Sequence, residues 1–169
     1  MKPLVSIIMG STSDLPVMEK AMKFLDEMEV PFEVNALSAH RTPDAVETFA
    51  KEAAGRGLKV IIAGAGMAAA LPGVIAASTT LPVIGVPIKG SALDGMDAMI
   101  SIIQMPPGIP VATVGINGAM NAAILAVEIM ALADEKLADK MKSYKAGLGA
   151  KIEKANKDLA EVKYNFKTN

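Results

Sequence analysis

The residues best suited to chemistry stand together in the hexapeptide Ser38-Ala39-His40-Arg41-Thr42-Pro43. His40 is the only histidine of the chain, and Arg41 is one of two arginines. An imidazole gains and loses a proton near neutral pH, and a guanidinium can hold a phosphate through two hydrogen bonds. The segment predicts proton transfer beside a bound anion. The alternatives are a structural histidine and an arginine exposed at the surface.

A second polar segment, Gly10-Ser11-Thr12-Ser13-Asp14, lies between an apolar run and a helical pattern. Free amides at a helix N-terminus attract anions. Ser11 and Ser13 would add hydroxyl donors, and Asp14 could hold a ribose diol. The alternative is an ordinary helix cap formed by Ser13 or Asp14. The segment matches neither the dinucleotide-binding nor the P-loop pattern, so it predicts neither an NAD nor an ATP site.

A third segment, residues 64–73, consists mostly of glycine and alanine. Such small side chains would let a ligand lie against the backbone in a small, dry pocket. They would equally suit tight packing between a helix and a strand. Within this segment we expect Met67 to form pocket wall rather than to take part in chemistry.

The pattern of apolar residues predicts alternating strands and helices, which indicates a parallel sheet with helices on both faces. The three polar or small segments then follow strands, where open parallel sheets bind ligands. Strands are expected at residues 4–9, 32–37, 60–63, 83–86 and 111–114. Helices are expected at 15–29, from 43 to 55 or 57, from the third segment to 78, at 97–103 and at 121–133.

The chain ends in a long amphipathic pattern. Apolar residues recur at helical spacing among lysines and acidic residues, and Gly147 and Gly149 weaken the pattern locally. Because this helix lies past the last strand, we expect it to pack on a neighbouring subunit; the alternative is a solvated terminal helix. The apolar positions are Leu137, Met141, Tyr144, Leu148, Ile152, Ala155, Leu159 and Val162.

Length and composition limit the remaining possibilities. The 169 residues fit one catalytic domain, with a core at about 4–133 and a helical extension at about 134–163. The chain has no cysteine and one histidine, which excludes disulfides and thiolate or multi-histidine metal sites. A net charge of −1 argues against a nucleic-acid partner. No apolar stretch has membrane-spanning length, and the N-terminus lacks a secretion signal, so we expect a cytoplasmic protein.

Several motifs together are similar to those of one known family. In chain order they are Gly10-Ser-Thr-Ser-Asp14, Ser38-Ala-His-Arg-Thr-Pro43, Ala63-Gly-Ala-Gly66, Leu71-Pro-Gly73, Leu81-Pro-Val-Ile-Gly-Val-Pro87 and residues 101–111. They closely resemble the N5-carboxyaminoimidazole ribonucleotide mutases, also described as the catalytic subunit of phosphoribosylaminoimidazole carboxylase. The resemblance extends from about Val5 to about Tyr144.

The resemblance implies a flavodoxin-like three-layer α/β/α fold, a homo-octamer, no metal and no cofactor. It implies an enzyme of purine biosynthesis that moves a carboxylate from the exocyclic nitrogen to ring carbon 4 of an aminoimidazole ribonucleotide. His40 would be the acid and base. Residues 104–106 would lie near the site, from an adjoining subunit. Ser11, Ser13 and Arg41 would bind the phosphate, Asp14 the ribose, and Ser38, Ala39, Ala65, Gly66 and Leu71 the base and carboxylate.

This chain departs from that family in the third segment. Many members read Gly-Gly-Ala-Ala-His-Leu-Pro-Gly, whereas this chain has Met67 and Ala70 at the second glycine and at the histidine. The departure leaves the carboxyl donor open, and an aminoimidazole ribonucleotide carboxylase using free CO2 is the alternative activity. Arg41 favours the mutase, since the carboxylase branch typically has lysine there. A non-catalytic nucleotide sensor and a purely structural assembly protein are further alternatives.

Overall fold

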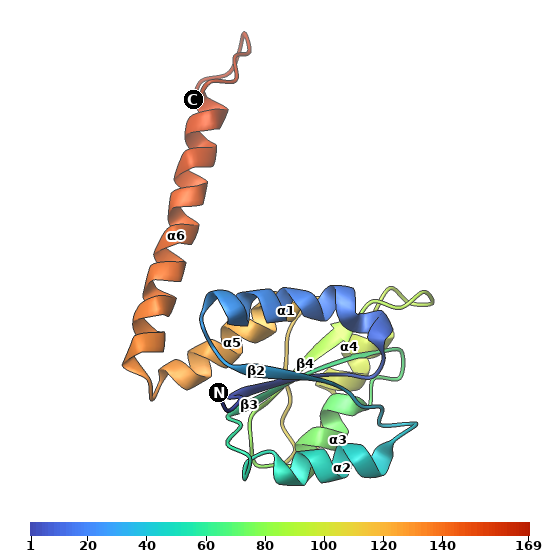
Figure 1. The fold of residues 1–169 in the computed structure, drawn as a ribbon. Coiled ribbons are helices and arrows are strands. Elements are labelled where there is room, and N and C mark those ends of the chain that lie inside the picture. The colour runs from blue at the N-terminus through green and yellow to red at the C-terminus, as the bar shows by residue number, and fades with distance from the viewer.

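The computed structural model describes residues 1–169 and contains a five-stranded parallel sheet with helices on both faces (Figure 1). The chain alternates strands and helices from β1 to α5 and ends in one long helix. The elements are β1 (Val5–Met9), a 3-10 turn η1 (Thr12–Asp14), α1 (Leu15–Glu27), β2 (Phe32–Ala36), α2 (Pro43–Glu52), β3 (Val60–Gly66), α3 (Leu71–Ser78), β4 (Val83–Ile88), α4 (Met96–Ile103), β5 (Ala112–Thr113), α5 (Ala119–Ala131) and α6 (Glu135–Ala160).

The strands lie in the order β2-β1-β3-β4-β5, and every pair is parallel. This is the order of flavodoxin-like folds, in which the strand order reverses beside β1 and ligands bind at the carboxyl ends of the strands there. The predicted flavodoxin-like α/β class is therefore confirmed. The carboxyl ends of β1, β2, β3 and β4 share one edge of the sheet.

Successive strand residues fill two separate cores, one on each face of the sheet. Ile7 packs with α1 and α5, whereas Ile8 packs with α2 and α3. In Figure 1, α1 and α5 cover one face, and α2 and α3 cover the other. Because central parallel strands are buried on both faces, they read in sequence as continuous apolar runs. These cores hold the strand ends rigidly in place.

Helix α6 packs against the domain only at its beginning. Leu137 and Met141 are buried with α1 and α5, and Tyr144 meets Phe24 edge-on, with 5.1 Å between ring centroids. Beyond this contact the helix extends away from the sheet (Figure 1). Gly147 and Gly149 do not interrupt it. The predicted helical extension is confirmed, and its first turns belong to the core of the domain.

The predicted extents of three strands were wrong, and α2 ends at Glu52 instead of at residue 55 or 57. Strand β3 continues three residues beyond Ala63 because its glycines and alanine pair with β4 as far as Gly66 and Ile88. Strand β4 is longer for the same reason. Strand β5 has two residues instead of the predicted four, since only Ala112 and Thr113 pair with β4 at this edge.

None of the helices combines the length and the apolar character needed to cross a lipid bilayer.

Candidate active site

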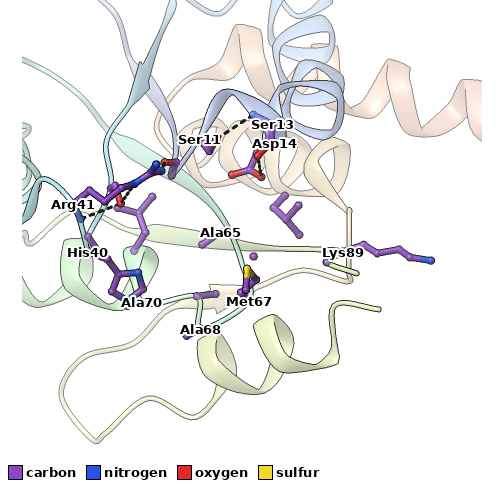
Figure 2. A pocket seen from close by; sticks show the side chains of 18 of the residues that line it. Ser11, Ser13, Asp14, His40, Arg41, Ala65, Met67, Ala68, Ala70 and Lys89 are labelled. Atoms are coloured by element: carbon purple, nitrogen blue, oxygen red, sulfur yellow. Dashed lines mark hydrogen bonds between the residues drawn. The ribbon is translucent and has the colours of Figure 1, made fainter. Parts of the chain in front are cut away.

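A cavity of about 580 Å³ opens at the carboxyl ends of β1, β2, β3 and β4 (Figure 2). All ten residues that the sequence singled out for the site line this one cavity, although they come from three segments far apart in the chain. They are Ser11, Ser13, Asp14, Ser38, Ala39, His40, Arg41, Ala65, Gly66 and Leu71. The structure thus brings the whole predicted set together, while the role of each residue stays a prediction.

The loop after β1 presents its hydroxyl and carboxylate groups to the cavity. The Ser13 amide donates to Ser11 Oγ over 3.3 Å and caps η1, while Ser13 Oγ donates to Asp14 Oδ1, also over 3.3 Å. Asp14 precedes α1 but makes no side-chain capping bond to it. The carboxylate of Asp14 is therefore available to a ligand. The alternative of a cap formed by Ser13 or Asp14 was wrong in its residue, since Ser11 is the cap and it caps η1.

The environment of Asp14 alters its titration. Partial burial raises the pKa of this carboxyl above its ordinary value, and the hydrogen bonds from Ser13 and from the backbone of Ser11 offset part of that rise. A hydrogen-bond partner brought by a ligand, such as a pair of hydroxyl groups, would stabilise the charged form. The chemistry of Asp14 suits a sugar diol better than an anion.

The loop after β2 is a tight turn held by Ser38 and Thr42. The Ser38 amide donates to Thr42 Oγ1 over 3.0 Å, and the Thr42 amide donates to the Ser38 carbonyl over 2.8 Å. Helix α2 begins at Pro43, as predicted, but the Thr42 hydroxyl bonds to Ser38 and caps no helix amide. This turn fixes the backbone that carries His40 and Arg41.

Arg41 connects the first two loops. Its Nη2 donates to the Gly10 carbonyl over 2.8 Å, and its Nε donates to Ser38 Oγ over 3.3 Å. The guanidinium therefore lies beside the β1 loop, on an exposed side chain that a ligand can reach. A cation held at this point would meet an anion bound at the N-terminus of α1.

His40 lies on the opposite side of Arg41 from the β1 loop. Its side chain is exposed, and Figure 2 shows the imidazole next to the third loop, where Ala68 and Ala70 also line the cavity. The ring thus faces the part of the cavity with the smallest side chains. The imidazole is thus separated from the loop that the sequence predicts to bind an anion.

The third segment serves both roles that its composition allowed: tight packing between a helix and a strand, and a cavity wall. A Cβ at Gly64 would lie 2.6 Å from Met18 Sδ, and a Cβ at Gly66 would lie 3.3 Å from the Ile88 carbonyl oxygen. Gly64 therefore serves packing against α1. Residues 65–71 form cavity wall instead, with methyl groups or hydrogen atoms facing most of the space.

A fourth loop that was not predicted from the sequence, residues 88–91 at the end of β4, also lines the cavity. The position of β4 beside β3 would have indicated it. Lys89 belongs to this loop, but its Nζ pairs with Asp94 over 2.9 Å, and Figure 2 shows its side chain pointing away from the other labelled residues. Residues 104–106 follow α4 and do not line this cavity within one chain; Met105 packs near Gly73. No cluster of three or more His, Asp or Glu side chains could hold a metal ion.

Comparison with protein families identifies the chain. The profile described as AIR carboxylase matches residues 4–151. The chain belongs to the AIR carboxylase family. All ten site residues lie inside the matched range, and so does the first half of α6.

Members of the AIR carboxylase family with curated names fall into two groups. The chain is 54% identical over 161 residues to the N5-carboxyaminoimidazole ribonucleotide mutase of Pyrococcus horikoshii. The aligned region covers 95% of this chain and 91% of that protein. It is 51% identical over 162 residues to the mutase of Thermotoga maritima, covering 96% and 95%. The phosphoribosylaminoimidazole carboxylase of Candida glabrata is 59% identical over 85% of this chain, which spans only 25% of that longer protein.

A solved structure in the family has the same fold. The crystal structure of PurE from Treponema denticola superposes with a TM-score of 0.83 at 34% identity, covering 93% of this chain and 98% of that one.

Proposed function

We propose that this chain interconverts N5-carboxyaminoimidazole ribonucleotide and 4-carboxyaminoimidazole ribonucleotide, as an enzyme of purine biosynthesis. The observation that carries the proposal is the arrangement along one cavity: hydroxyls and Arg41 at one end, His40 and a wall of small apolar residues at the other. The substrate has the same polarity along its length, with a phosphate at one end and a reacting heterocycle at the other. The names of the relatives that align over nearly the whole chain support the same reaction.

The phosphate would bind between the β1 loop and Arg41. Ser11 and Ser13 offer hydroxyls, and Arg41 is already oriented by Gly10 and Ser38, so little reorganisation is needed on binding. Asp14 would accept hydrogen bonds from the ribose. These contacts do not change during the reaction, and they therefore serve to position the ring.

His40 would transfer both protons of the reaction. As an acid it protonates the carbamate nitrogen, the C–N bond breaks, and CO2 and a neutral aminoimidazole result. The electron-rich ring carbon then attacks CO2, and His40, now a base, removes the hydrogen from that carbon. The reaction is redox-neutral and returns the imidazole to its starting state, so one histidine suffices.

The carboxyl group would travel through the part of the cavity formed by Ser38, Ala39, Ala65, Gly66 and Leu71. Small apolar walls exclude water and hold CO2 near the ring carbon. Loss of CO2 to solvent competes with its capture, and a shielded pocket favours capture.

An aminoimidazole ribonucleotide carboxylase that uses free CO2 is the second candidate. Two observations favour it. The fungal relative from Candida glabrata is named phosphoribosylaminoimidazole carboxylase, and this chain spans a quarter of its length. Ala70 also stands in the third loop where many family members have a histidine. The test supplies purified protein with N5-carboxyaminoimidazole ribonucleotide, and separately with aminoimidazole ribonucleotide plus bicarbonate, while the absorbance of the 4-carboxy product is followed. Efficient turnover of only the second mixture would contradict the mutase proposal. A nucleotide sensor would give product from neither mixture.

The assembly expected from the sequence, a homo-octamer in the cytoplasm, is part of the proposal. The charge distribution supports self-association: residues 1–134 carry eight basic and 13 acidic side chains, whereas residues 135–169 carry nine basic and five acidic ones. The outer half of α6 also exposes Leu148, Ile152 and Leu159. A basic, partly apolar helix thus extends from an acidic domain, as expected if it docks on a second copy. Light scattering should give the mass of eight chains, and high salt should weaken the assembly.

A further inference from the structure

Met67 differs from every other residue of the third loop. It is the only long side chain of residues 64–70, and 69% of its surface is exposed although it lines the cavity. Leu71, the next long side chain, is buried in the core. Its position at the edge of the cavity allows this side chain to contact a ligand held inside.

Met67 also has a backbone conformation that is uncommon for a residue with a side chain. Its φ is +55°, in the left-handed region, which costs a residue with a Cβ about 1–2 kcal/mol relative to glycine. The bonds from the Ala69 amide to the Met67 carbonyl (2.9 Å) and from the Ala70 amide to the Ala68 carbonyl (2.7 Å) hold the loop in this form. Glycine would fit this backbone without strain, so the backbone conformation does not itself require a methionine here.

The side chain spans the opening between two loops. A Cβ added at Gly90, in the loop after β4, would lie 3.8 Å from Met67 Cγ. Figure 2 shows Lys89 on one side of Met67 and Ala65, Ala70 and His40 on the other. The unbranched side chain is flexible and can adopt other rotamers at this edge of the cavity.

We propose that Met67 determines the carboxyl donor by covering the carboxyl pocket, so that CO2 released from the substrate is recaptured before dissolved CO2 can replace it. The inference rests on the proposed function. CO2 is small and uncharged, and a thioether retains it by contact while offering no proton that could compete with His40. In the covered step the carbamate C–N bond breaks as nitrogen gains a proton, and the new C–C bond forms as the ring carbon loses one.

The test measures how much carbon from solution enters the product. Enzyme is mixed with N5-carboxyaminoimidazole ribonucleotide in ¹³C-bicarbonate, with carbonic anhydrase to keep dissolved CO2 labelled. The initial labelled fraction of 4-carboxyaminoimidazole ribonucleotide is read by mass spectrometry after subtraction of the enzyme-free reaction. For the unaltered protein we expect mainly unlabelled product.

Three substitutions separate the side chain from the backbone. Met67→Ala and Met67→Gly should each raise the labelled fraction about fivefold, the change expected when a handful of atom contacts is lost. Met67→Leu keeps the bulk and should stay near the unaltered protein. Met120→Ala, which removes an exposed methionine outside the cavity, is the matched control and should change nothing.

Each result bears on the inference. Unchanged labelling in both Met67→Ala and Met67→Gly would overturn it, as would an increase in Met67→Gly alone, which would indicate backbone freedom, or a Met67→Leu protein as leaky as Met67→Ala. Fully labelled product from the unaltered protein would also overturn it. Failure of the unaltered protein to make any product would instead refute the proposed function, so the two failures are distinguishable.

Discussion

Replacement of Arg41 by alanine should weaken substrate binding far more than it slows the chemical step. Arg41 lies between the Gly10 carbonyl and Ser38 Oγ, at the end of the cavity away from the apolar wall. One hydrogen bond to a charged group contributes about 1.5–3 kcal/mol. Its loss corresponds to a rise in KM on the order of 10- to 150-fold. Because a phosphate contact is the same in the ground and transition states, kcat should change little.

The control is Arg56→Ala, which removes the other arginine of the chain. Arg56 pairs with Glu33 and lies 5.6 Å from the Phe49 ring centroid, away from the cavity, so its loss changes the net charge equally but should leave KM unaltered. The assay follows product absorbance over a range of substrate concentrations, with the unphosphorylated nucleoside as a second substrate. Arg41→Ala should reduce the preference for the nucleotide. A fall in kcat with unchanged KM would refute the assignment of Arg41 to the phosphate.

Three further outcomes follow from the geometry. His40→Asn should lower kcat by about 10²- to 10⁴-fold without weakening nucleotide binding measured by calorimetry, because only proton transfer is lost; retained turnover would contradict its role. Since burial raises the pKa of Asp14, the folded state binds more protons than the unfolded one just above the unfolded pKa, and stability falls as pH rises through that window. Asp14→Asn should therefore raise the melting temperature of the ligand-free protein at pH 7 while raising KM; a lower melting temperature would refute this. Gly85→Ala should cost about 1–3 kcal/mol in urea unfolding, because its Cβ would lie 2.5 Å from Ile102 Cγ2, whereas Gly147→Ala in α6 should be neutral or stabilising.

The sequence predicted the location of the site better than the extents of the strands around it. The polar segments at Gly10 and Ser38 follow apolar runs long enough to be recognised as buried strands, and all parallel strands end at one edge. That topological rule is sufficient to bring Ser11, His40 and Ala65 into one cavity. It needs no knowledge of side-chain contacts.

The predicted strand extents were wrong where pairing with a neighbouring strand, rather than residue type, decides which residues are extended. Gly64, Ala65 and Gly66 have low strand propensity, and they are extended because β4 pairs with them. Strand β5 lies at an edge of the sheet. There Val111 and Val114 have high strand propensity, but they lie outside the two residue pairs that join β5 to β4. The loop after β4 was missed because Lys89 and Gly90 form no recognisable motif, and only the position of β4 beside β3 makes them part of the cavity.

The association of chains through α6 can be measured without any substrate. Its 26 residues span roughly 39 Å, but its contacts with the domain extend only through Tyr144, which packs on the core, and Lys145, which pairs with Glu128. The remaining turns, about as long as a helix that is marginal alone in water, rely on a neighbour for protection. Deuterium uptake should therefore be slow around Leu137 and rapid around Leu159 in dilute monomer, and the difference should disappear as copies join.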